Sequence, residues 1–215
     1  MNLESTRDWM INHQIRPWNV FDPQVLDALG QVKREEFVPE AFRGLAFADT
    51  EIPLPQGQNM LKPLLEGRLL QELQLHSEHQ VLVVGTGSGY LTACIATLSS
   101  HVTAIDRHEE LTNHAQTALA LSKIGNTKLL TAEFSDYAPD RQFDRILLTG
   151  ALPTLDERLP EWLSEEGLLI APIGAAPSMA IEAVRRSGNQ YSRTRLFETV
   201  VTPLENVAET ASFSL

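Results

Sequence analysis

Residues 81–90 read VLVVGTGSGY: an apolar run, three glycines separated by single residues, and the start of a helical pattern. The apolar run predicts a buried strand, and the glycines predict a tight turn into a helix. In a doubly wound sheet this turn is where a nucleotide-like ligand lies, because glycines let ligand and backbone approach closely. We therefore expect ligand contacts from Gly85, Thr86, Gly87, Ser88 and Gly89. A purely structural turn is the alternative.

Strand and helix patterns alternate along the chain around this turn. Strands are predicted at 80–85, 101–106, 127–132, 143–151 and 168–174, and helices at 90–98, 109–125 and 153–167. The stretches 178–186 and 191–201 read as two further strands joined by a Gly-Asn turn. This alternation predicts a doubly wound, mostly parallel α/β sheet covered on both faces, with an antiparallel hairpin at one edge.

The segment before the glycine turn is helical and irregular. Asp22 followed by Pro23 predicts a helix start, since Asp is a good N-cap and proline suits the first helical position. We expect residues 1–62 to form an N-terminal helical segment and acceptor loop packed on a core of residues 63–215. No linker divides the chain, so the two parts are expected to form a single domain.

An acid follows the glycine turn at the spacing of a ribose-binding site. Asp106 ends the second strand about 20 residues after Gly85, where an acid holds a ribose hydroxyl pair. It could equally cap the helix that follows. NAD binding remains an alternative, but the NAD fingerprint needs a third glycine at the position of Tyr90. The observed G-x-G-x-G spacing resembles the class I S-adenosylmethionine-dependent methyltransferases, which implies a Rossmann-like fold and S-adenosyl-L-methionine as cofactor.

A more specific resemblance lies upstream of the turn. The stretch VLDALGQVKREEFVPEAFRGLAFADTEIPLPQGQNMLKP, residues 25–63, is similar to the N-terminal segment of protein-L-isoaspartate (D-aspartate) O-methyltransferases. The similarity continues through VLVVGTGSGY, VTAIDRHEEL, APDRQFDRILLTGA and EEGLLIAPIG, so it covers roughly residues 10–175. It implies methylation of the free α-carboxylate of isoaspartyl residues in damaged proteins or peptides, which begins their repair. An acceptor carboxylate is already ionised at neutral pH, so this chemistry needs alignment rather than a general base.

The acceptor loop departs from the family pattern. The family reads G-Q-T-I-S-x-P where this chain has Gly57-Gln58-Asn59-Met60-Leu61-Lys62-Pro63. Leu61 replaces a serine and cannot form a hydrogen bond, whereas Asn59 retains an amide that can orient a carboxylate. We therefore predict an acceptor loop of Gln58, Asn59, Met60 and Leu61, and no catalytic residue is assigned. A different methyl acceptor, including a small molecule, and a non-catalytic cofactor-binding protein are the alternatives.

The resemblance also implies cofactor contacts beyond the turn. Arg107 follows Asp106, and Glu133 and Phe134 stand where the family has G-D-G near the adenine. Glu133 keeps a carboxylate, and Phe134 can pack on an adenine ring. Val83 occupies a position where the family has an acid, which removes one polar anchor.

Composition and isolated residues argue against several other classes of function. The 215 residues carry a net charge of −11, which argues against nucleic acid as a partner. No apolar run approaches the roughly 18 residues that span a bilayer, and the N-terminus does not read as a secretory signal. The single cysteine, Cys94, is expected to be a buried side chain of a cytoplasmic protein.

His76 and His79 have no third ligand nearby, so no metal site is predicted, and Ser88 lacks the spacing of a hydrolase nucleophile. The oligomeric state cannot be read from the sequence.

Overall fold

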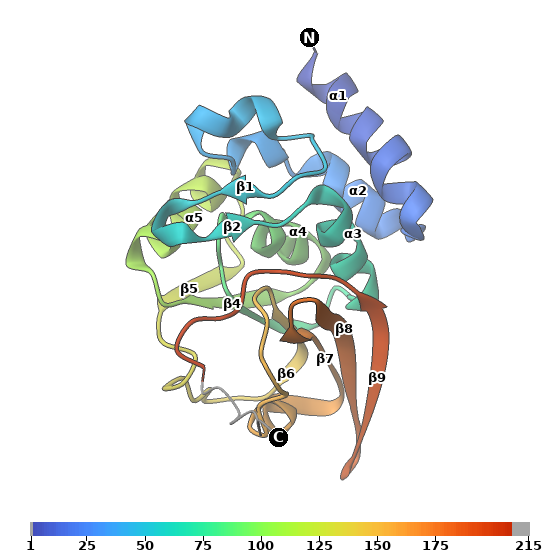
Figure 1. Cartoon of the computed structure of the whole chain (residues 1–215), viewed down its shortest axis with the longest axis vertical. Coiled ribbons are helices and arrows are strands. Elements are labelled where there is room, and N and C mark those ends of the chain that lie inside the picture. The colour runs from blue at the N-terminus through green and yellow to red at the C-terminus, as the bar shows by residue number, and fades with distance from the viewer. Residues whose placement is uncertain (1, 208–215) are drawn as a thin grey trace.

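A seven-stranded sheet forms the centre of the protein in the computed structural model, which describes residues 2–207 (Figure 1). The strand order is β5-β4-β3-β6-β7-β8-β9. The first five strands in this order run parallel: β5 (Thr127–Thr131), β4 (His101–Asp106), β3 (Gln80–Val84), β6 (Phe143–Leu148) and β7 (Leu163–Ala175). The antiparallel strands β8 (Ser178–Ser187) and β9 (Gln190–Glu198) complete one edge. The predicted mostly parallel sheet with an edge hairpin is confirmed. Residues 208–215 of the predicted 63–215 core lie outside the described residues.

Helices cover one face of this sheet. They are α3 (Pro63–Glu72), α4 (Tyr90–Leu98) and α5 (Glu109–Leu121). Val81 and Val83 of β3 belong to the apolar cluster that includes these helices, whereas Leu82 and Val84 belong to a second cluster. A central parallel strand is buried on both sides, which explains why β3 reads as a continuous apolar run.

Irregular segments cover the opposite face. Its cluster includes Phe134 and Trp162, whose rings meet edge to face with centroids 6.0 Å apart. The helix predicted over residues 153–167 is wrong: the structure has one 3-10 turn, Leu159–Trp162, and β7 already begins at Leu163. Pro160 lies in the middle of the predicted helix, where it lacks an N–H donor and its ring clashes with the preceding turn.

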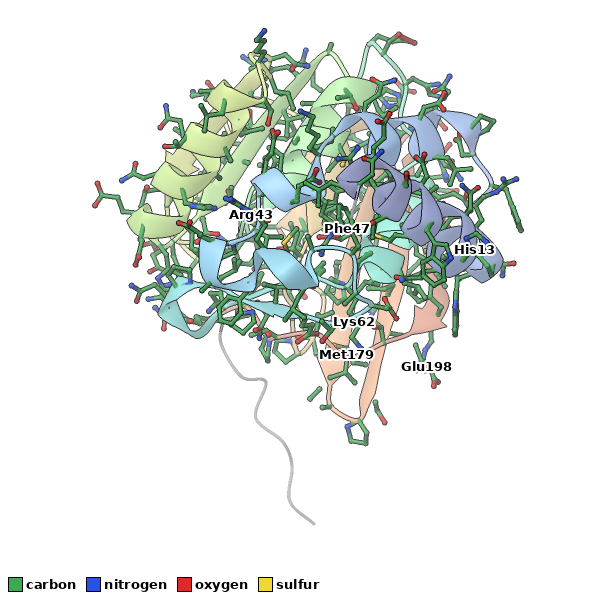
Figure 2. The ribbon with its side chains drawn as sticks, turned by 90° about the horizontal axis from the view of Figure 1, so that it is seen from above. His13, Arg43, Phe47, Lys62, Met179 and Glu198 are labelled. Atoms are coloured by element: carbon green, nitrogen blue, oxygen red, sulfur yellow. The ribbon has the colours of Figure 1, made fainter. Side chains whose placement is uncertain are left out.

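The N-terminal segment packs across the helical face. It contains α1 (Leu3–Met10), α2 (Pro23–Gln31) and the short strands β1 (Ile52–Pro53) and β2 (Asn59–Met60), joined by short helical turns. Asp22 caps α2 as predicted, its Oδ1 accepting from the Gln24 N–H at 2.9 Å. Viewed from above, this segment, with His13, Arg43 and Phe47, lies on the near side of the sheet (Figure 2).

Two ion pairs are buried in this part of the molecule. Arg7 of α1 pairs with Glu35, and Arg34 pairs with Glu66 of α3 at 2.9 Å. Arg34 and Glu35 belong to the same 3-10 turn, Arg34–Glu36. The turn therefore connects α1 on one side with α3 on the other.

Candidate functional site

A pocket lies beyond the carboxyl ends of β3, β4 and β6. It encloses about 740 Å³, including the space at its open mouth. Its apolar lining comes from the sheet, α5 and the segment after β5, and its polar lining comes from the strand ends, the acceptor loop and the C-terminal region. The lining includes Gln58, Asn59, Leu61, Val84, Gly85, Gly87, Ile105, Asp106, Arg107, His108, Leu111, Ala132, Glu133, Phe134, Thr149, Gly150, Thr202, Pro203, Leu204 and Glu205.

The three glycines of the turn have different neighbours. All three have positive φ angles, between 55° and 92°. A Cβ on Gly85 would lie 2.2 Å from Thr149 Oγ1, and one on Gly89 would lie 2.8 Å from the Ala115 Cβ, so packing within the protein requires both glycines. A Cβ on Gly87 would meet only Leu54 Cδ1 at 3.7 Å, and Gly87 lines the pocket. Gly87 is thus the glycine whose missing side chain leaves room for a ligand.

Not all of the five residues predicted from the turn line the pocket. Gly85 lines the pocket, whereas Thr86, Ser88 and Gly89 are not among its lining residues. Ser88 is buried, and its Oγ accepts from the Tyr90 N–H at 3.3 Å at the start of α4. The Thr86 hydroxyl is buried without a hydrogen-bond partner within the described part of the chain.

Asp106 connects the turn to the end of β4. Its Oδ2 accepts from the Gly87 N–H at 3.0 Å, and its Oδ1 accepts from the His108 N–H at 3.0 Å. Asp106 therefore supports the start of α5, which was one of the two roles expected from the sequence. It also lines the pocket. Each carboxylate oxygen can accept a further hydrogen bond, so this arrangement is compatible with a bound hydroxyl pair.

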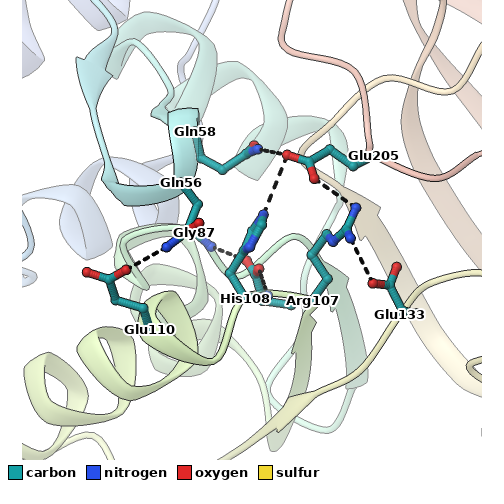
Figure 3. Close-up of polar contacts among 9 residues, drawn as sticks. Gln56, Gln58, Gly87, Arg107, His108, Glu110, Glu133 and Glu205 are labelled. Atoms are coloured by element: carbon teal, nitrogen blue, oxygen red, sulfur yellow. Dashed lines mark hydrogen bonds and ion pairs between the residues drawn. The ribbon is translucent and has the colours of Figure 1, made fainter.

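Arg107 holds two carboxylates at the pocket rim (Figure 3). Its guanidinium lies 3.1 Å from Glu133 Oε1 and 2.7 Å from Glu205 Oε2. Glu205 also accepts from Gln58 Nε2 at 2.6 Å, and its carboxylate lies 3.5 Å from His108 Nε2. A chain of polar contacts thus links the acceptor loop to the ends of β4 and β5. The positive charge of Arg107 is paired with two carboxylates in this chain.

Phe134 forms an aromatic part of the pocket wall. Its ring is largely buried against Trp162, and the Arg158 guanidinium lies 5.2 Å from the ring centroid. Val83, which replaces a family acid, is fully buried and is not a lining residue. The acids that do line the pocket are Asp106, Glu133 and Glu205, and together they form its acidic rim.

The acceptor loop lies over the same pocket. It is fixed by the β1–β2 pairing, in which Pro53 lies opposite Asn59 and Ile52 opposite Met60. Gln58, Asn59 and Leu61 line the pocket, whereas Met60 turns into the apolar core. The structure thus brings three of the four predicted loop residues together with the glycine turn.

Residues 199–207, which we call the C-terminal strap, complete the pocket. The strap runs back from β9 towards the ends of the central strands (Figure 1). Two backbone hydrogen bonds join it to Ala151: the Ala151 N–H donates to the Thr202 carbonyl at 3.0 Å, and the Leu204 N–H donates to the Ala151 carbonyl at 2.8 Å. Asn59 Nδ2 donates to Thr202 Oγ1 at 3.4 Å. Sequence reasoning missed Thr202 and Glu205, because no local pattern shows that the strap returns to the strand ends.

Metal clusters and membrane-spanning helices were the other features considered in the sequence. Within residues 2–207 no cluster of three or more His, Cys, Asp or Glu side chains is arranged to hold a metal ion. His76 and His79 contact each other, with the His76 N–H donating to His79 Nδ1 at 3.0 Å. No helix in this range is long and apolar enough to cross a membrane.

The sheet order, the closing hairpin and the glycine-turn pocket define a Rossmann-like fold of the methyltransferase class. Residues 5–208 match the profile of the Protein-L-isoaspartate(D-aspartate) O-methyltransferase family. The chain belongs to this family.

Individual relatives agree with this placement. The Protein-L-isoaspartate O-methyltransferase of Koribacter versatilis is 34% identical over 196 residues, which is 91% of this chain and 88% of the relative. Protein-L-isoaspartate O-methyltransferase 1 of Geotalea uraniireducens is 32% identical over 213 residues and covers 96% of both chains. A solved Plasmodium falciparum structure, assigned as a protein-L-isoaspartate O-methyltransferase in complex with S-adenosyl-L-homocysteine, has a TM-score of 0.82 at 23% identity. The alignment covers 95% of this chain and 99% of that one.

Proposed function

We propose that this protein is an S-adenosylmethionine-dependent O-methyltransferase that acts on the α-carboxylate of isoaspartyl residues in damaged proteins or peptides. The observation that carries this proposal is the shared pocket: the acceptor loop and the glycine turn line one cavity, in a chain that belongs to this family over nearly its whole length. A methyl donor and an acceptor must lie side by side for transfer, and a common cavity provides that proximity.

The pocket suits S-adenosylmethionine better than a dinucleotide. A dinucleotide carries a pyrophosphate, which requires positive charge or free backbone donors. Here the rim carries three acids, and the guanidinium of Arg107 is already paired with two of them. The room at Gly87, the carboxylates of Asp106 and Glu133 and the wall of Phe134 fit an adenosyl group with an amino acid side arm. The proposed cofactor-binding set is Gly85, Thr86, Gly87, Ser88, Gly89, Asp106, Arg107, Glu133 and Phe134, with Thr86, Ser88 and Gly89 acting through the shape of the turn.

When bound, S-adenosylmethionine supplies a methyl group that is already activated on a sulfonium. The acceptor carboxylate, with a pKa near roughly 4, is already ionised, so the residues of this chain need only orient it and exclude water. Leu61 is mostly buried and forms an apolar wall of the pocket. It can exclude water but cannot hold an acceptor oxygen.

We assign the orienting role to Asn59 and Thr202. Thr202 Oγ1 accepts from Asn59 Nδ2, so the hydroxyl hydrogen of Thr202 and the second amide hydrogen of Asn59 are both available to the acceptor. Thr202 lines the pocket from the strap, beside Asn59 of the loop. In this arrangement Thr202 supplies the hydroxyl that the loop lacks at Leu61.

The proposed acceptor is a polypeptide, and the proposed location is the cytoplasm. The proposed acceptor rests on the family. The proposed location rests on the single cysteine, Cys94, which is buried and fits a reducing compartment. The acidity of the chain supports the exclusion of nucleic acid as a partner.

The test uses two synthetic hexapeptides that are identical except that one contains an isoaspartyl and the other an aspartyl residue. Each is incubated with the protein and methyl-labelled S-adenosylmethionine, and base-labile label in the peptide is counted. We expect label on the isoaspartyl peptide alone. Bound cofactor, confirmed by calorimetry, together with no label on either peptide would refute the proposed acceptor.

A further inference from the structure

Arg34 is a fully buried arginine whose guanidinium contacts three separate parts of the chain. Its Nε donates to Glu66 Oε2 at 2.9 Å, one terminal nitrogen donates to the Ala46 carbonyl at 2.7 Å, and the other donates to the Leu61 carbonyl at 2.6 Å. Arginine presents these donors in a rigid planar fork, so fixing two of them fixes the third. The Leu61 carbonyl is therefore held by a group that is itself immobilised.

The third contact reaches the acceptor loop directly. Leu61 is the pocket-lining residue at the end of the loop, just before Lys62 and the start of α3 at Pro63. The β1–β2 pairing fixes the loop at Asn59 and Met60, and Arg34 fixes it at Leu61. These contacts hold the loop backbone at Asn59, Met60 and Leu61, and the first and last of these residues line the pocket.

The same guanidinium lies against the start of α4. The Arg34 Cζ is 5.4 Å from the centroid of the Tyr90 ring, and Tyr90 is the first residue of α4, immediately after the glycine turn. A guanidinium over an aromatic face is attracted by the ring quadrupole. Arg34 thus touches both the end of the acceptor loop and the start of the helix that follows the turn.

We propose that Arg34, oriented by Glu66, is a positioning residue that sets the place of the acceptor loop relative to the glycine turn. This inference rests on the proposed function, because the loop matters only if an acceptor binds against it. Arg34 acts through the Leu61 carbonyl and does not line the pocket. A charge-assisted hydrogen bond in a buried site contributes more than a neutral one, so its loss should loosen the loop.

The chain offers a matched control. The Arg7–Glu35 pair is also buried, with side chains 8% and 7% exposed against 0% and 2% for Arg34 and Glu66. Apart from Glu35, Arg7 donates to the Gly30 carbonyl, and neither side chain of this pair forms a hydrogen bond with the acceptor loop. Replacing each pair by apolar residues of similar volume removes its charges without leaving an unpaired ion. The test variants are therefore Arg34→Met/Glu66→Leu and Arg7→Met/Glu35→Leu.

Amide hydrogen exchange of the peptide spanning residues 56–62 gives a readout that does not depend on activity. We expect exchange in this peptide to accelerate about ten-fold or more in the Arg34→Met/Glu66→Leu variant and to stay unchanged in the control. Arg34→Lys, which keeps the charge but loses the fork, provides a second variant if the double variant does not fold, and it should accelerate exchange in the same direction. Equal exchange in both double variants, or unchanged exchange in Arg34→Lys, would overturn the proposal.

Kinetics with the isoaspartyl peptide separate positioning from general stability. We expect the Arg34→Met/Glu66→Leu variant to lose about ten-fold in kcat/KM for the peptide, with the dissociation constant of S-adenosylmethionine changed less than about two-fold. The control should keep both values. A protein that never methylates the peptide would refute the proposed function, while the exchange experiment would still decide the role of Arg34.

Discussion

Replacing Glu66 with glutamine removes a carboxyl group that lies inside the protein. Burial raises the pKa of Glu66 from 4.5 to about 7, and the opposing effect of Arg34 does not offset it. The charged or titratable groups around it are Arg34 from the 3-10 turn and Tyr90 and Cys94 from α4. Burial also raises the pKa of the Tyr90 phenol and of the Cys94 thiol, so neither titrates between pH 4 and 8.

The sign of the effect follows from the direction of the shift. A carboxyl group with a raised pKa in the folded state stabilises the fold most below its unfolded pKa, and this contribution is lost as pH rises through the folded pKa. For values of 4.5 and about 7, the full contribution is about 3 kcal/mol. Of this, about 2 kcal/mol is lost between pH 5.5 and pH 8. Glutamine does not titrate, so the Glu66→Gln variant lacks this pH dependence.

Urea unfolding of the natural protein and of Glu66→Gln at pH 5.5 and pH 8 measures this quantity. The free energy of unfolding of the natural protein, relative to that of the variant, should fall by about 2 kcal/mol over this range. A difference that stays constant would mean that Glu66 does not titrate in this window. A difference that grows with pH would mean that the ionised pair stabilises the fold, and the reasoning would then be wrong.

Four other substitutions and one ligand test the pocket. Gly87→Ala should lower the affinity for S-adenosylmethionine more than ten-fold in calorimetry, because its methyl group enters the pocket, while the positive φ costs only about 1–2 kcal/mol of stability. Gly85→Ala should reduce stability further, since its Cβ would clash with Thr149, and a smaller loss than for Gly87→Ala would contradict the packing argument. Thr202→Val should reduce kcat/KM for the isoaspartyl peptide about ten-fold without changing cofactor affinity, and Thr202→Ser should retain activity; equal rates in all three proteins would exclude a role for the hydroxyl. NAD at millimolar concentration should give no binding heat, and measurable binding would undermine the argument from the acidic rim.

The core of the fold was predictable because its signals are local. The apolar run at 81–84 and the glycines that follow are adjacent in sequence, and they specify a strand and a turn without reference to distant residues. Asp106 was predictable for the same reason, since its spacing from the turn reflects one helix and one strand. The helix predicted at 153–167 is wrong because Pro160 lies in its middle, where the structure has only the 3-10 turn Leu159–Trp162.

The rest of the site depends on contacts between distant residues. Thr202 meets Asn59 only because the strap pairs with Ala151, and nothing in the residues around Thr202 indicates this return. Arg34 and Glu35 lie in the charged run at 33–36, and both are buried because each has its partner far away in the sequence. Single-sequence patterns do not contain such pairings.

A crystal structure of the protein with S-adenosylhomocysteine and an isoaspartyl hexapeptide would show the cofactor product and the acceptor in one pocket. We expect the adenosyl group to lie against Phe134 with the turn at Gly87 beside the ligand. We expect the peptide α-carboxylate to lie within hydrogen-bond distance of Asn59 Nδ2 and Thr202 Oγ1. An adenosyl group bound elsewhere would contradict the cofactor assignment. A carboxylate held away from both Asn59 and Thr202 would contradict the proposed role of the loop and strap.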